Sequence, residues 1–246
     1  MKSRRFAFVA LTALALAGCK KTADSGVSAP ATPVASVAPP AGKSWTDIVA
    51  TTPEGGVRIG NPDAPVKFVE YASFTCPHCK HFEDQGSEAL LSNYVSTGKV
   101  SWEFRSFLIH GPDAPVTLLM NCRGADPFFK LSQQLYATQD TWLTKLVNLP
   151  EDQQKELQGL APVDQFKRMV NVMGLYSFMA ARGLPKAQAD ACLADQKAID
   201  ALTAQQNRFQ NDDQINSTPT FFINGQRQDE IADWAGLEPR LKAAIG

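Results

Sequence analysis

The sequence carries almost no charge imbalance and few histidines. Lysine and arginine together number 24 against 25 acidic residues, and there are three histidines. A chain without a basic surplus lacks the electrostatic footprint of nucleic-acid binding, so we expect no nucleic-acid partner. Internal repeats are also missing, which excludes repeat architectures.

No apolar run is long enough for a permanent membrane helix. Residues 6–17 are apolar but too few to span a bilayer, and they follow basic residues at positions 2, 4 and 5. This pattern is typical of an export signal. Leu16-Ala17-Gly18-Cys19 then resembles the bacterial lipobox, which implies cleavage after residue 18 and lipidation of Cys19. The alternative is an ordinary signal peptide in which Cys19 is incidental. Cleavage leaves 21 basic and 25 acidic residues, a net charge of −4.

Cysteine is scarce, but two of the five cysteines stand in the motif Cys76-Pro77-His78-Cys79. The motif follows the apolar run 66–74, which predicts a strand that leads into a helix. Two cysteines three apart on a first helical turn lie on one face and can form a disulfide. Backbone N–H groups and the helix dipole stabilise a thiolate at that position. We therefore predict that the pKa of Cys76 falls from about 8.5 to about 3.5–7.5.

The two residues between the cysteines favour the same chemistry. Pro77 has no N–H to leave unpaired, and its fixed φ suits the first helical turn. His78 supplies a nearby donor or cation that further favours the thiolate of Cys76. Stabilising the reduced, ionised form makes the disulfide more oxidising, so we predict that it accepts electrons from substrate thiols.

The alternatives for this cluster are a zinc site and a purely structural disulfide. Cys76, Cys79, His78 and His81 are residue types that bind zinc. Four ligands within six residues of one helix cannot easily surround a metal tetrahedrally, and no second Cys/His cluster occurs elsewhere in the sequence. We therefore predict no metal and no bound cofactor.

The remaining cysteines form an even set once the lipobox cysteine is set aside. If Cys76 pairs with Cys79, two others are left. Cys122 and Cys192 then either form a second disulfide or remain buried thiols. They lie 70 residues apart, and closing such a loop stabilises a fold by about 4 kcal/mol in the chain-entropy model. We favour a structural disulfide between Cys122 and Cys192.

The rest of the pattern predicts strands and helices near both ends of the chain. Residues 20–43 are rich in Ala, Pro and Ser without periodicity, which indicates an extended tether. Strands are expected at 57–60 (an edge strand), 66–74 (buried on both faces), 100–109, 218–223 and 226–229, with a hairpin turn at Asn224-Gly225. Helices are expected at 77–97 and at 234–244, the second capped by Asp233.

Strand-like runs disappear between residues 114 and 210. Apolar residues there recur at helical spacing, and Gly and Pro separate several helices. We interpret two stripes as core rather than as the lining of a groove: Phe128, Leu131, Leu135 and Phe166, Met169, Val170, Met173. The element order predicts an α/β fold, a central mixed sheet with helices on both faces and a helical insertion.

Taken together, these features resemble the DsbA-like branch of the thioredoxin superfamily over roughly residues 55–246. The matching points are the Cys76–Cys79 motif, Glu70 six residues before it, the helical insertion and the late segment Ser217-Thr218-Pro219-Thr220. The resemblance implies a thioredoxin-like fold in which Pro219 is cis and lies against the redox pair. The backbone at Thr218 is then free to pair with a substrate strand. It also implies that Glu70 is buried, that burial raises its pKa, and that it relays a proton to Cys79.

The resemblance further implies a domain plan and a function. The predicted parts are a lipoprotein-type signal peptide (1–18), a lipidated cysteine with a Pro/Ala-rich tether (19–43), a thioredoxin-like domain (44–112 and 211–246) and a helical insertion (113–210). The implied function is a periplasmic thiol:disulfide oxidoreductase, anchored to a membrane through Cys19. It would transfer the Cys76–Cys79 disulfide to exported proteins with free thiols, and a membrane redox partner would restore that disulfide.

Three alternatives stay open. Threonine rather than valine precedes Pro219, a feature shared by isomerases and some oxidases, so a reductase or isomerase kept reduced by a membrane partner is the second hypothesis. Against an isomerase, residues 20–43 are too short and too Pro-rich for a dimerisation domain. A tethered chaperone or binding module without catalysis is the third hypothesis. The last is maturation of a copper protein, suggested by His78 and His81 beside the thiols.

Overall fold

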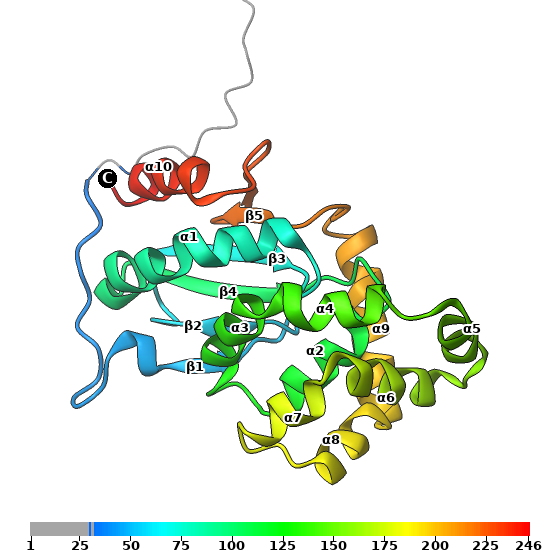
Figure 1. The fold of residues 1–246 in the computed structure, drawn as a ribbon. Helices are drawn as coiled ribbons and strands as arrows, with labels where there is room; N and C mark the ends of the chain where they lie inside the picture. The colour runs from blue at the N-terminus through cyan, green and yellow to red at the C-terminus, as the bar shows by residue number, and fades with distance from the viewer. Residues whose placement is uncertain (1–29, 31) are drawn as a thin grey trace, which may run out of the picture.

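A computed structural model describes residue 30 and residues 32–246 (Figure 1). The predicted signal peptide and Cys19 lie outside the described residues, as does the first part of the predicted tether. No helix of the described part has the length and apolar character needed to cross a bilayer.

One six-stranded sheet organises the described residues. Its strand order is β1-β2-β4-β3-β5-β6, with β3 and β4 parallel and all other neighbours antiparallel. The strands are β1 (Val49–Thr51), β2 (Val57–Ile59), β3 (Val66–Ala72), β4 (Val100–Ser106), β5 (Thr220–Ile223) and β6 (Gln226–Arg227). The prediction of an edge strand at 57–60 is wrong, because β1 pairs outside β2 and makes it an interior strand.

Two helices follow the strands of the thioredoxin-like part. Helix α1 (Pro77–Asn93) follows β3, and a short 3-10 turn (Val95–Thr97) leads to Gly98, whose φ of 73° ends the helical segment. Helix α10 (Trp234–Ile245) follows the late hairpin. The predicted cap of α10 is confirmed, since Asp233 Oδ1 accepts a hydrogen bond from the backbone N–H of Gly236 at 2.8 Å.

A block of helices lies between β4 and β5, as the sequence predicts. No strand interrupts it among the described residues. Its members are α2 (Asp113–Cys122), α3 (Phe128–Ala137), α4 (Gln139–Val147), α5 (Glu151–Gly159), α6 (Pro162–Met173), α7 (Leu175–Ala180), α8 (Lys186–Leu193) and α9 (Gln196–Asn211). In Figure 1 this block extends to one side of the sheet, away from α10.

The main core lies between the sheet and α1. Phe68 on β3, Phe82 on α1, Trp102 on β4 and Phe221 on β5 contact one another, with ring centroids 4.8–6.5 Å apart. Both predicted apolar stripes of the helical block belong to this core. Five of their residues are buried, while Phe166 and Met169 are partly buried and pack against the others.

The opposite face of the sheet is covered only in part. At the end of β3, the ring of Tyr71 packs edge-on against Phe209 of α9, with centroids 4.9 Å apart. Lys67 and Val69, nearer the start of β3, are half-buried. The prediction that this strand is buried on both faces is therefore wrong at these two positions, because the packing of Phe209 covers only the Tyr71 end.

The described end of the predicted tether lies against the domain. The backbone N–H of Val34 donates to the Ile245 carbonyl at 2.8 Å, and that of Val37 donates to the Thr97 carbonyl at 3.0 Å. The indole N–H of Trp45 also donates to the Val37 carbonyl, at 2.7 Å. These bonds fix residues 34–37 beside α10 and the end of α1.

Candidate active site

Two thiols lie at the N-terminus of α1, where β3 delivers the chain to the helix. Cys76 is the N-cap residue and Pro77 occupies the first helical turn. Cys76 keeps 3 % of its surface exposed and Cys79 keeps none. The Cys76 thiol donates a hydrogen bond to the Thr218 carbonyl, with the sulfur 3.3 Å from the oxygen. The Thr218-Pro219 peptide bond is cis, and the hydrogen bond from Cys76 places the late loop against the dithiol.

The surroundings of Cys76 favour its thiolate. The pKa of Cys76 is lowered to about 5, chiefly by a hydrogen bond from the Cys79 thiol. The Thr218 side chain and the backbone N–H groups of Cys79 and His78 act in the same direction, while burial opposes them. The Thr218 hydroxyl is buried without a hydrogen-bond partner. This hydroxyl lies near enough to the Cys76 sulfur to favour its thiolate.

Cys79 has the opposite character. Burial is the main reason that its pKa lies well above the ordinary value, and the hydrogen bond and charge of Cys76 act in the same direction. The charge of Glu70 raises it further. One thiol of the pair is therefore ionised at neutral pH and the other is protonated.

Glu70 lies beneath the dithiol on the core face of β3. It is 2 % exposed, and its carboxylate accepts a hydrogen bond from the Trp102 indole N–H at 3.1 Å. Burial raises the pKa of Glu70 well above its usual range, with a further contribution from the charge of Glu83. A carboxyl whose pKa is raised in this way is suited to donate its proton to a leaving thiolate.

The sequence reasoning missed a second acid, Glu83. It is buried on α1, and burial raises its pKa to about 7. It also lines a pocket of about 260 Å³ that Trp102 and Lys130 help to form. Glu83 lies four residues after Cys79, so helical spacing places the two on one face. That spacing is the signal that could have identified it.

A buried polar cluster fixes the turn before Cys76. Asp113, at the start of α2, accepts hydrogen bonds from the Ser73 hydroxyl at 2.8 and 2.9 Å and from the Thr75 hydroxyl at 3.0 Å. The Thr75 hydroxyl also lies 2.8 Å from Nδ1 of His110. The helical block therefore holds the residue that precedes the nucleophile.

Two further side chains of the helical block support the same turn. The Gln139 amide donates to the carbonyls of Phe74 and Cys76 at 2.8 and 3.0 Å, and the Tyr136 hydroxyl donates to the Ser73 carbonyl at 2.9 Å. No sequence motif marks these residues, because their partners are backbone atoms more than sixty positions away.

A groove of about 330 Å³ lies beside the dithiol. His78, Thr218 and Pro219 form one part of it, and Arg227, Gln228 and Glu230 form another. The imidazole of His78 is exposed at this groove, whereas the backbone N–H of the same residue acts on Cys76. His78 thus links the groove to the helical turn that carries Cys76.

The other predicted cysteine pair is bonded. Cys122 of α2 and Cys192 of α8 form a disulfide, with their Cα atoms 6.1 Å apart. Within the described residues, no three His, Cys, Asp or Glu side chains are grouped closely enough to hold a metal ion. His81 follows Cys79 on α1 and belongs to no such group.

Comparisons with known proteins agree with this geometry. A family model described as thioredoxin matches residues 52–243. A crystal structure of a protein-disulfide isomerase from Novosphingobium aromaticivorans is 32% identical with a TM-score of 0.72, covering 76% of this chain and 95% of that one. Alpha-DsbA1 of Wolbachia pipientis has a TM-score of 0.60 at 20% identity, covering 81% and 98%, which shows a shared fold.

The matches to sequence relatives cover only part of each relative's length. A protein of Rickettsia bellii named "Putative protein-disulfide oxidoreductase" is 24% identical over 173 residues, which cover 70% of this chain and 58% of the relative. The chain thus matches little more than half the length of the curated relatives.

Proposed function

The chain belongs to the thioredoxin family, and we propose that it acts there as a thiol:disulfide oxidoreductase that accepts electrons from the thiols of other proteins. The observation that carries this proposal is the opposite character of two adjacent thiols. The pKa of Cys76 is about 5, while that of the buried Cys79 is raised. A stable thiolate in the reduced pair favours reduction of the disulfide.

The reaction follows from this asymmetry. A substrate thiolate attacks the Cys76 sulfur, the Cys76–Cys79 bond breaks, and Cys79 leaves with the electron pair. Because Cys79 prefers its protonated form, it takes up a proton. A second substrate thiolate then attacks the substrate sulfur of the mixed disulfide and releases Cys76 as a thiolate. Two substrate thiols become a disulfide, and the enzyme disulfide becomes one thiol and one thiolate.

Glu70 is proposed as the proton donor to Cys79. It is buried close enough for its charge to raise the pKa of that thiol. Glu70→Gln should slow reduction of the oxidised pair by about 10²-fold or more at neutral pH, since general acids supply about 10²–10⁴-fold. Stopped-flow tryptophan fluorescence measures this rate. Glu83→Gln is the matched control, and a loss confined to that variant would assign the relay to Glu83 instead.

The groove is proposed to bind the substrate. Thr218, Pro219 and His78 line it, and the backbone of Thr218 would pair with an extended substrate segment. Pro77 keeps the first turn of α1 in place. We propose that Thr218 and Pro219 bind the substrate. Pro77 and His78 would support catalysis by Cys76.

A reductase or isomerase role is the second candidate. Two observations favour it: the similar Novosphingobium structure is described as an isomerase, and Thr218 stands before the cis proline. Incubation with a reduced peptide that has two cysteines and with a scrambled disulfide protein separates the roles. An oxidase in its disulfide form oxidises the peptide stoichiometrically. An isomerase in its dithiol form restores activity to the scrambled protein. Cys76→Ala should abolish either activity.

Location and partners are part of the proposal. Residues 1–18 would be removed and Cys19 lipidated, with residues 19–43 as the tether, 113–210 as an insertion and the rest as the thioredoxin-like domain. This arrangement would hold the domain at a membrane in the periplasm, near exported proteins and a membrane redox partner that reoxidises Cys79. Mass spectrometry of the membrane fraction tests it, since Cys19→Ala should release the chain from the membrane.

A further inference from the structure

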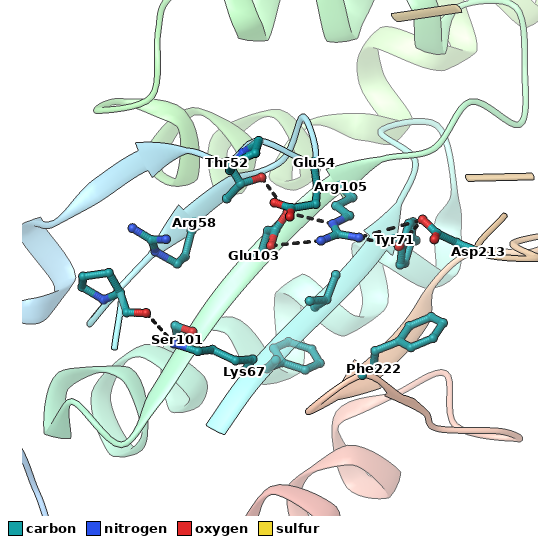
Figure 2. Close-up of a pocket in the computed structure, with 15 residues that line it drawn as sticks. Thr52, Glu54, Arg58, Lys67, Tyr71, Ser101, Glu103, Arg105, Asp213 and Phe222 are labelled. Carbon is teal, nitrogen blue, oxygen red and sulfur yellow. Dashed lines mark hydrogen bonds and ion pairs between the residues drawn. The ribbon is translucent and has the colours of Figure 1, made fainter. Parts of the chain in front are cut away.

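A second pocket lies on the face of the sheet that helices cover only in part. It has a volume of about 430 Å³ and is formed by β2, β3, β4 and the loop after β1 (Figure 2). Val69 and Phe222 supply apolar surface. None of the residues that line it belongs to the dithiol or its groove.

In one half of this pocket the charged side chains are paired with one another. Arg105 donates to both carboxylate oxygens of Glu103 at 2.7 and 3.2 Å and to the Tyr71 hydroxyl at 2.6 Å. Tyr71 donates in turn to Asp213 at 2.7 Å, and Thr52 donates to Glu103 at 2.7 Å. Figure 2 shows these side chains pointing toward one another. Its one cation, Arg105, is shared by the carboxylates of Glu103 and Asp213, so this network has no cation left to offer a ligand.

The other half holds two cations without an anionic partner. No carboxylate among the described residues forms an ion pair with Arg58 or Lys67. The Nε atom of Arg58 is buried and has no hydrogen-bond partner, and the Lys67 ammonium donates to the carbonyl of Pro62. Burial and the nearby charge of Arg58 lower the pKa of Lys67, partly offset by Asp63. Half-buried like charges are unfavourable unless an anion joins them.

We propose that this pocket binds a small organic anion whose phosphate or carboxylate lies between Arg58 and Lys67. The apolar part of the ligand would cover Val69 and Phe222. A guanidinium and an ammonium that line one pocket match the charge and hydrogen-bonding capacity of such a head group. The site is separate from the thiol chemistry, and its occupancy does not depend on the redox state of Cys76.

Glu54 is the internal competitor at this site. It lines the pocket and forms no ion pair among the described residues, so its carboxylate repels an incoming anion. Replacing it with glutamine should tighten binding. The Glu54 variant is therefore a second test of the proposal, because it should strengthen binding where loss of Arg58 or Lys67 should weaken it.

Isothermal titration of the full chain with phenyl phosphate and with benzoate tests the proposal. Both probes carry one aromatic ring and differ in the head group. Saturable binding of at least one is expected. Arg58→Gln and Lys67→Gln should each weaken it by about tenfold or more, the loss typical of a charge-assisted hydrogen bond. Arg58→Lys should retain most of the binding if the charge is what matters.

The controls define the result that would overturn the proposal. Lys197→Gln removes an exposed lysine on α9, and Cys76→Ala removes the nucleophile; both should bind as the wild type does. Absence of saturable binding, equal binding of uncharged benzyl alcohol, or unchanged binding by Arg58→Gln and Lys67→Gln would refute the anion site. Equal affinity for inorganic phosphate and phenyl phosphate would refute the role of Val69 and Phe222.

Discussion

Acidification should change how the reduction potential of the Cys76–Cys79 pair depends on pH. Because the pKa of Cys76 is about 5 and that of Cys79 is raised, reduction takes up one proton at neutral pH and two below the pKa of Cys76. For a two-electron couple this gives a slope of about 30 mV per pH unit near neutrality and about 59 mV below the break. The break should lie near pH 5.

The same pKa fixes how far the potential is raised. An ordinary thiol with a pKa of 9.0 is protonated at pH 7, whereas Cys76 is ionised across the two pH units between 5 and 7. At 1.36 kcal/mol per unit, ionisation stabilises the reduced form by about 2.7 kcal/mol. The sulfur lies beside an open groove where water and salt screen charge, so we take half of this value as the lower bound. The disulfide is then about 30–60 mV more oxidising than with an unshifted Cys76.

Equilibration in graded glutathione buffers from about pH 4 to pH 8 measures both quantities. The titration is repeated with Cys122 and Cys192 replaced by serine, so that one pair alone is observed. A slope that stays at about 59 mV per unit through neutral pH would show that Cys76 is protonated and would refute the reasoning. A potential as low as that of thioredoxin, about −270 mV, would exclude the oxidase and favour a reductase.

Three other predictions follow from single contacts. Thr218→Val should raise the pKa of Cys76 by about one unit, because a hydrogen bond to an ionised group contributes about 1.5 kcal/mol. Thiolate absorbance measured against pH checks this prediction, and an unchanged titration would contradict it. Glu83 has a folded pKa of about 7, above its unfolded value of about 4.3, so the wild type should lose up to about 4 kcal/mol of stability as pH rises between them. Glu83→Gln should remove this loss in urea unfolding. Serine at both Cys122 and Cys192 should lower the free energy of unfolding by about 4 kcal/mol for their 70-residue separation, and a loss below about 1 kcal/mol would contradict the entropic estimate.

Local chemistry is what the sequence alone determined. Cys76 and Cys79 follow an apolar strand and begin a helix, and the effect of a helix N-terminus on a thiolate needs no tertiary information. The position of the late hairpin and the cap at Asp233 also depend on neighbouring residues only. Helical spacing placed Phe128 and Val170 in the core, since a period of 3.6 residues reports a buried face directly.

Contacts between segments far apart in the sequence could be found only in the folded protein. Gln139 and Asp113 hold the turn before Cys76 from helices far along the chain, and nothing in their local sequence marks them. The outer position of β1 depends on its pairing with β2. The partial exposure of the sheet face opposite α1 depends on how far α9 reaches across it. Arg58 and Lys67 line one pocket only because the sheet sets their two strands on either side of β4. A charged side chain has no partner or competitor until the fold supplies one.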